Sequence, residues 1–102
     1  MPKAVVCREL GPPESLRLEN FAAAPLAPGQ LRVAIRAAGI NFPDILMAAG
    51  EYQLKPPLPF TPGVEAAGDV VEVNAAADVA VGDRVIVKMR HGAYCDEAIA
   101  AP

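Results

Sequence analysis

The chain has 102 residues, of which 53% are hydrophobic and 5% aromatic, and it carries a formal net charge of −3. This length allows one compact domain with a modest core, and because charges of both signs are scattered along the chain, no basic patch is available for nucleic acid or for an anionic membrane surface. No apolar run reaches the roughly eighteen residues that span a bilayer and the N-terminus lacks a signal peptide, so the sequence predicts a cytoplasmic protein without nucleic-acid or membrane partners.

The first part of the chain predicts a β-hairpin. A short run rich in β-branched residues, Lys3–Leu10, stops at the Gly-Pro-Pro turn of residues 11–13. In Ser15–Phe21, Leu16 and Leu18 alternate with charged residues, which is the two-residue period of a half-buried strand. Two such strands separated by a strong turn are expected to pair with each other.

The third predicted strand has the clearest pattern in the sequence. Apolar residues alternate with two arginines and two alanines from residue 31 to residue 38, and the apolar positions are Leu31, Val33, Ile35 and Ala37. One face of this strand is therefore expected to be apolar, while the other carries Arg32 and Arg36.

A short helix is predicted directly after this strand, over residues 42–49. Its apolar residues fall at i, i+3, i+4 and i+7 and would line one side of the helix: Phe42, Ile45, Leu46 and Ala49. Pro43 suits the first helical turn, Asp44 suits the positive end of the helix dipole, and Gly50 suits a left-handed stop. Asp44 is interpreted as a first-turn acid rather than as a catalytic base.

A proline-rich loop and three more strands are predicted to complete the domain. Prolines at positions 56, 57, 59 and 62 fix φ and favour a stiff, extended crossing. The strands are Gly63–Asn74, Arg84–Lys88 and Tyr94–Ala100. With one helix and turn signals at frequent intervals, the chain is predicted to be mainly β and to close as a small, irregular barrel.

Four strings of the sequence resemble a known family. They are AGINFPD, GEYQLKPPLPFTPGVEAAGDVVEV, VGDRV and GAY, and the match around them runs from about Lys3 to the end of the chain. They resemble the N-terminal catalytic domain of the medium-chain dehydrogenase/reductase superfamily, and in particular its zinc-independent quinone oxidoreductase, or zeta-crystallin, branch. The resemblance implies a mainly β, cochaperonin-like (GroES-like) fold: a partly open, irregular β-barrel with one or two short helices.

The resemblance also implies a longer enzyme. A doubly wound dinucleotide-binding domain follows the catalytic domain in this family, and this sequence contains no G-x-G-x-x-G fingerprint. Residues 1–102 are therefore expected to be a truncated substrate-side domain, inert alone, of a homodimeric enzyme that transfers hydride from NADPH to a quinone or an α,β-unsaturated carbonyl. The alternative is a non-catalytic binding or oligomerisation module of the cochaperonin type. Such a module needs a long polar loop where this chain has a helix and prolines.

No metal site is predicted. Zinc-dependent relatives carry a cysteine near Asn41 or Phe42, and Gly-His-Glu where residues 63–65 of this chain read Gly-Val-Glu. Catalytic zinc needs three protein ligands, and the only local pair here is His91 with Cys95. His91 is expected to be a solvated loop residue, and Cys95, like Cys7, is expected to be a free thiol.

Asn41 is the predicted cofactor-binding residue. The resemblance places the reactive ring of the cofactor near it, so its amide could hydrogen-bond the nicotinamide, the ribose or the substrate carbonyl. The alternative is an asparagine that only satisfies backbone groups before the helix. Because Pro43 falls in the first helical turn, Phe42 rather than Asn41 is expected to be the cap.

Tyr52 is the predicted catalytic residue, because its phenol can donate to a quinone or enone oxygen while its ring walls the pocket. The alternative is a packing tyrosine in a proline-rich loop. Phe42 and Leu46 are predicted to line the substrate pocket together with Tyr52. Several relatives carry a tyrosine at the position of Leu46, which leaves the acceptor preference open. Arg90 is expected to be solvated.

Overall fold

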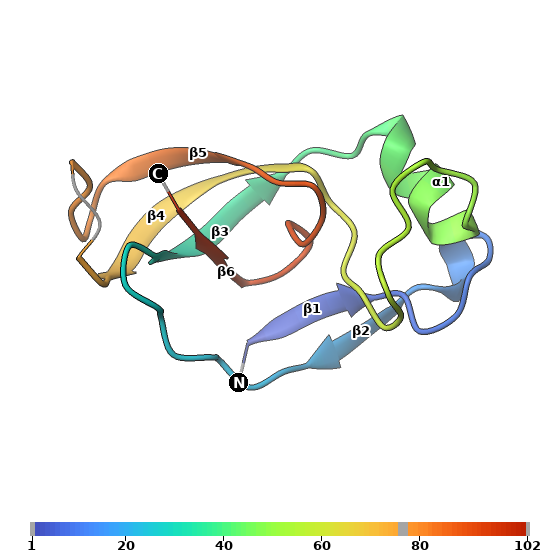
Figure 1. The fold of residues 1–102 in the computed structure, drawn as a ribbon, viewed down its shortest axis with the longest axis horizontal. Helices are drawn as coiled ribbons and strands as arrows, with labels where there is room; N and C mark the ends of the chain where they lie inside the picture. The colour runs from blue at the N-terminus through green and yellow to red at the C-terminus, as the bar shows by residue number, and fades with distance from the viewer. Residues whose placement is uncertain (1, 76–77, 102) are drawn as a thin grey trace.

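The computed structural model describes residues 2–75 and 78–101, and within them the chain forms six strands, one α-helix and one turn of 3₁₀ helix (Figure 1). In chain order these are β1 (Lys3–Val6), η1 (Pro13–Ser15), β2 (Arg17–Asn20), β3 (Leu31–Ala38), α1 (Phe42–Ala49), β4 (Glu65–Val73), β5 (Arg84–Lys88) and β6 (Glu97–Ala100). The mainly β prediction is confirmed.

β1 and β2 form the predicted antiparallel hairpin, with Lys3 opposite Asn20 and Val6 opposite Arg17. Both strands are shorter than predicted. The segment between them turns instead into η1, where the backbone N–H and the hydroxyl group of Ser15 both donate to the carbonyl of Pro12, at 3.0 and 2.7 Å. The chain is therefore already turning where the sequence pattern predicted extended structure.

The other four strands form one antiparallel sheet in the order β5-β4-β3-β6. Two irregularities in the β3-β4 pairing bend this sheet over the hairpin, which lies beneath it in Figure 1. Isolated bridges connect the hairpin side to two loop segments: Ala4 pairs with Cys95, before β6, and Cys7 pairs with Phe60, in the proline-rich loop. The described residues thus form a partly open barrel, as the resemblance implied, and not the closed one that the sequence pattern suggested.

The core is divided into two clusters. The helix-side cluster consists of Cys7, Met47, Ala48 and Phe60, and the sheet cluster consists of Leu31, Val33, Val70 and Val87. All of these residues are buried, with Cys7 and Val33 at 0% exposure. Burial of an aliphatic side chain of this size stabilises the fold by about 1.5–3 kcal/mol.

α1 begins and ends where the sequence predicted, but it buries a different face. Gly50 ends it with a φ of 76°, as expected of a left-handed stop. Phe42 and Ile45, predicted to lie on the apolar side, are 70% and 42% exposed, whereas Met47 and Ala48 enter the helix-side cluster. The prediction was wrong because the helix is apolar around most of its circumference, so tertiary contacts rather than periodicity select the buried face.

The helices of the described region include none that is both long and apolar enough to cross a membrane.

Candidate functional site

A cavity of about 510 Å³ opens beside the N-terminal end of α1. It is formed by four segments: the first turn of the helix, the loop after the helix, the residue before β4 and the residues after β5. Its lining residues are Pro43, Tyr52, Gln53, Leu54, Val64, Met89 and Arg90. This mixture of an apolar wall with a few polar groups is typical of a small-molecule site.

Tyr52 both packs in the core and lines this cavity. Its half-buried ring lies against the helix-side cluster, so the packing role considered from the sequence is real. Its hydroxyl group makes no side-chain hydrogen bond to another residue that the structure describes. The phenol is therefore anchored by its ring and free to donate.

Asn41 is the N-cap of α1, so the prediction that Phe42 caps the helix was wrong. The backbone of Asn41 is extended, with φ −127° and ψ 154°. Its N–H donates to the carboxylate of Asp44 at 2.9 Å, and its carbonyl accepts from the N–H of Asp44 at 3.0 Å. Pro43 does not prevent this arrangement, because the first N–H groups of a helix have no partner within the helix.

The side chain of Asn41 nevertheless has an unused donor. Its Nδ2 atom is buried and has no hydrogen-bond partner among the described residues. Leaving a buried polar group unpaired costs about 1–3 kcal/mol, so such groups call for a specific explanation.

Asp44 is more than the first-turn acid that the sequence predicted. It is buried, with 3% exposure, and its carboxylate also accepts a hydrogen bond of 3.1 Å from the N–H of Gly63 and one of 2.7 Å from the hydroxyl group of Tyr94. Burial, followed by the hydrogen bond to Asp44 and its charge, raises the pKa of Tyr94 above its ordinary range. No local sequence pattern predicts this contact, because Tyr94 lies 50 residues further along the chain.

The structure does not bring all three predicted pocket residues to one cavity. Tyr52 lines the cavity beside α1, but Phe42 and Leu46 are not among its lining residues. Phe42 is largely exposed at the start of the helix, and Leu46 is half-buried. Their assignment to the substrate pocket stays a prediction.

Arg90 and Met89 are cavity residues that the sequence pattern did not reveal. Arg90 is exposed, as expected, but it also lines the cavity. Met89 is held there because its N–H donates to the carbonyl of Val64 at 2.8 Å. The available signal was the pairing of β4 with β5, which sets residues after Lys88 beside those before Glu65.

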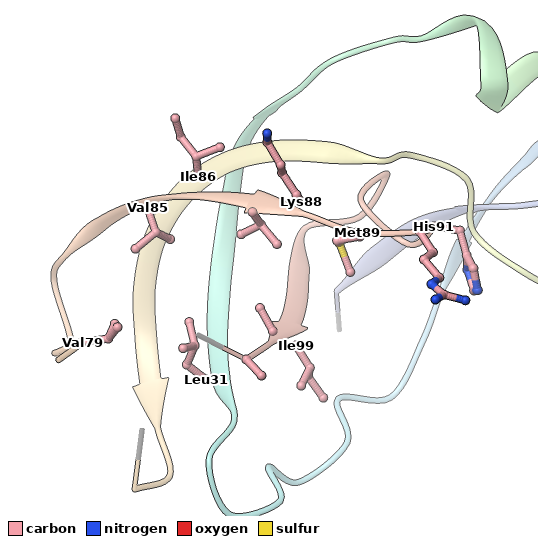
Figure 2. A pocket seen from close by; sticks show the side chains of 12 residues that line it. Leu31, Val79, Val85, Ile86, Lys88, Met89, His91 and Ile99 are labelled. Atoms are coloured by element: carbon pink, nitrogen blue, oxygen red, sulfur yellow. The ribbon is translucent and has the colours of Figure 1, made fainter. Parts of the chain in front are cut away.

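A second cavity, of about 520 Å³, lies against the four-stranded sheet, and Figure 2 shows Leu31, Val85 and Ile99 directed toward it. It shares Met89 and Arg90 with the cavity beside α1. Its wall is mostly aliphatic, and none of the predicted site residues lines it. We therefore place the candidate site in the cavity beside α1.

The donor set of the described residues does not form a metal centre. No group of three or more His, Cys, Asp or Glu side chains comes together in residues 2–75 and 78–101. His91, expected to be solvated, is instead half-buried, with its ring edge-on to Phe60 at a centroid distance of 6.0 Å. Cys7 and Cys95 are free thiols.

Known proteins are similar to this chain in both sequence and fold. The chain is 47% identical over 85 residues to a quinone oxidoreductase-like protein 2 homolog of Nematostella vectensis, a match that covers 82% of this chain and 23% of that protein. A probable oxidoreductase of Mycobacterium abscessus superposes with a TM-score of 0.92 at 38% identity, covering 99% of this chain and 32% of that one. The chain thus spans about a quarter to a third of the length of these relatives.

The quinone oxidoreductase of Escherichia coli, solved in complex with NADPH, superposes with a TM-score of 0.89 at 33% identity, covering 97% of this chain and 31% of that one. The family profile described as alcohol dehydrogenase GroES-like domain matches residues 27–101. This match includes β3, α1, the proline-rich loop and every strand of the four-stranded sheet. The chain therefore belongs to the alcohol dehydrogenase GroES-like domain family of the medium-chain dehydrogenases/reductases, with quinone oxidoreductase-like proteins among its relatives.

Proposed function

We propose that this chain is the substrate-side domain of an oxidoreductase that transfers hydride from NADPH to a quinone or an α,β-unsaturated carbonyl without zinc. The observation that carries the proposal is the buried, unpaired Nδ2 of Asn41. Asn41 stands two residues before Pro43, and Pro43 lines the same cavity as Tyr52. The NADPH found in the Escherichia coli relative supports the choice of cofactor.

The residues of this chain fit the nicotinamide end of NADPH. NADPH, when bound, supplies the hydride. Asn41 would hydrogen-bond its carboxamide or ribose and so hold the ring toward the cavity. Tyr52 would donate its hydroxyl proton to the acceptor oxygen, which gains negative charge as the hydride arrives. Leu54 and Met89 supply apolar walls that exclude water from the reacting atoms.

The absence of zinc from the proposal rests on the chemistry of the side chains. The position at the head of α1 carries an amide, Asn41, and the segment before β4 carries Val64 where zinc-dependent relatives are expected to have histidine. An asparagine amide and a valine cannot replace the thiolate and imidazole that zinc prefers. Proton donation by Tyr52 would stabilise the developing oxyanion in place of zinc.

We further propose that the cofactor phosphates are held outside this chain, in a dinucleotide-binding domain of the complete, homodimeric enzyme. The sequence has no G-x-G-x-x-G turn that could cradle a pyrophosphate. The 102-residue chain alone is therefore expected to bind NADPH very weakly and to catalyse no hydride transfer. A fluorescence titration of the chain with NADPH tests this, and binding in the micromolar range would contradict it.

The function is tested by NADPH oxidation in the polypeptide that joins residues 1–102 to a dinucleotide-binding domain, with a panel of quinones and enones as acceptors. We expect Asn41→Ala to raise the KM for NADPH or lower kcat by about tenfold, and Tyr52→Phe to lower kcat by about tenfold or more. Asp83→Asn, in an exposed turn before β5, is the control and should have no effect. Activity should survive EDTA. Unchanged turnover in both site variants would contradict the roles of Asn41 and Tyr52. Loss of activity with EDTA would contradict a reaction without zinc.

A further inference from the structure

We propose that Asp44 and Tyr94 form a positioning pair that holds Asn41 in its ligand-binding orientation. The inference rests on the proposed function of Asn41 and assigns a role to two residues that do not themselves touch the ligand.

The first step of the argument is the convergence of three donors on one carboxylate. Oδ2 of Asp44 accepts from the N–H of Asn41 at 2.9 Å and from the hydroxyl group of Tyr94 at 2.7 Å, while Oδ1 accepts from the N–H of Gly63 at 3.1 Å. The donors come from the segments after β3, before β4 and before β6. A single buried side chain thus ties the start of α1 to two other segments, the one before β4 and the one before β6.

The second step is that Tyr94 itself has little freedom. Its N–H donates to the carbonyl of Pro62 at 3.0 Å, and the N–H of Ala93 donates to the carbonyl of Gly63 at 3.1 Å. A Cβ atom at Gly63 would lie 2.6 Å from the Tyr94 ring and 2.8 Å from its backbone nitrogen. The backbone of Tyr94 is therefore held in place, so its hydroxyl group reaches Asp44 from a fixed position. The position of the Asp44 carboxylate thus depends on the segments before β4 and β6 as well as on α1.

The third step connects this pair to Asn41. The backbone of Asn41 is held by Asp44 on both sides, through the bonds to its N–H and its carbonyl. Its side-chain Nδ2, in contrast, has no partner among the described residues and stays buried. An unpaired buried donor is unfavourable, so it stays in place only if the surrounding structure holds it there. Asp44, with Tyr94 behind it, is the contact that does so.

Exchange of the side-chain amide protons tests the positioning pair without any cofactor. The chain has three asparagines, at positions 20, 41 and 74, which provide internal references for NMR. Asn20 is exposed, and Nδ2 of Asn74 donates to the carbonyl of Leu26 at 2.9 Å. In the wild-type chain we expect the Asn41 amide protons to exchange more slowly than those of Asn20. Tyr94→Phe, which removes one hydroxyl group, should accelerate exchange at Asn41 about tenfold and leave Asn74 unchanged.

Asp44→Asn is the second variant and should accelerate Asn41 exchange further, while Asp83→Asn is its matched control. The Asp83 carboxylate also accepts a backbone N–H, from Ala80 at 2.9 Å, but in an exposed turn. Unchanged Asn41 exchange in Tyr94→Phe would overturn the proposal. An equal rise at Asn41 and Asn74 would overturn it as well, because it would show a general loosening of the fold.

Enzyme kinetics separate this inference from the proposed function. In the polypeptide with its dinucleotide-binding domain, we expect Tyr94→Phe to raise the KM for NADPH or lower kcat about fivefold when Asn41 is present, and to have no further effect in an Asn41→Ala background. Additive effects would overturn the positioning pair alone. A wild-type level of activity in Asn41→Ala would instead overturn the proposed function, and this inference with it.

Discussion

The hydroxyl group of Tyr94 donates a hydrogen bond of 2.7 Å to the carboxylate of Asp44, 50 residues earlier in the chain. This contact joins the segment before β6 to the first turn of α1, and so connects the last strand of the sheet to the only α-helix of the described region. Its energy and its pH dependence are both measurable.

Tyr94→Phe should destabilise the fold at neutral pH and reduce its sensitivity to alkali. Loss of a hydrogen bond to a carboxylate is expected to lower the free energy of unfolding by about 1.5–3 kcal/mol. Because the pKa of Tyr94 is raised in the folded state, the unfolded chain releases this proton first, near a pH of about 10. The contribution is thus complete below about pH 10 and is lost as the pH rises further toward the folded-state pKa.

The measurement is the melting temperature of the wild type and of Tyr94→Phe between neutral pH and pH 11 or so. The difference between the two proteins should shrink above about pH 10. A difference that stays constant over this range would show that Tyr94 titrates alike in the folded and unfolded chains.

Gly63→Ala should be far more destabilising than Gly82→Ala. Both glycines have positive φ, 105° and 96°, so alanine pays a backbone cost of about 1–2 kcal/mol at either position. A Cβ atom at Gly82 would meet nothing within 4 Å, whereas at Gly63 it would lie 2.8 Å from the backbone nitrogen of Tyr94. Urea unfolding should give a loss of about 3 kcal/mol or more for Gly63→Ala. Equal losses would contradict the close packing of Gly63 against Tyr94.

Cys95 should resist alkylation at ordinary pH in the folded protein. Burial, followed by the negative charge of Asp96, raises the pKa of Cys95 to about 11, and the thiolate is the reactive form. Burial, with a smaller contribution from Glu9, also raises the pKa of Cys7. Peptide mapping after iodoacetamide treatment at pH 8 should show little modification of either thiol until urea unfolds the chain. Rapid labelling of Cys95 in the native state would contradict its partial burial in the fold.

Phe42→Ala tests whether the exposed ring at the start of α1 belongs to the substrate pocket. With 70% of the residue exposed, its loss should change the free energy of unfolding by only about 0.5 kcal/mol. The KM for an apolar quinone should nevertheless rise in the polypeptide with its dinucleotide-binding domain. Val81→Ala, another exposed apolar position at 64%, is the control. Equal KM values in the two variants would remove Phe42 from the pocket.

Leu46→Ala completes this test from the second turn of the helix. Leu46 is half-buried, so the substitution should lower both the stability and the affinity for the acceptor, in contrast to Phe42→Ala. If the KM stays at the wild-type value while the stability falls, Leu46 contributes to packing alone.

Local patterns were enough to predict much of the fold. The alternation in β3 and the start and stop signals of α1 each lie within about ten residues, and both elements appear where they were expected. The ends of β1 and β2 were less predictable, because Ser15 donates two hydrogen bonds to the carbonyl of Pro12. The strand pattern does not reveal the turn that these bonds form.

The site was harder to predict because its contacts are distant in sequence. The N-cap role of Asn41 rests on a local pair of bonds, from its N–H to the Asp44 carboxylate and from the Asp44 N–H to its carbonyl, but the burial of Asp44 depends on donors 19 and 50 residues away. Charged side chains are rarely buried without such partners, and the sequence alone indicated only a first-turn helix acid at Asp44. The cavity-lining role of Met89 likewise follows from strand pairing rather than from its own neighbours.

The division of the core into two clusters has a consequence for the candidate cavity. Tyr52 and Leu54 pack against the helix-side cluster, whereas Met89 packs against the sheet cluster, and all three line the candidate cavity. The wall of the cavity therefore depends on the packing of both clusters. A substitution that shifts either cluster would alter the shape of the same cavity.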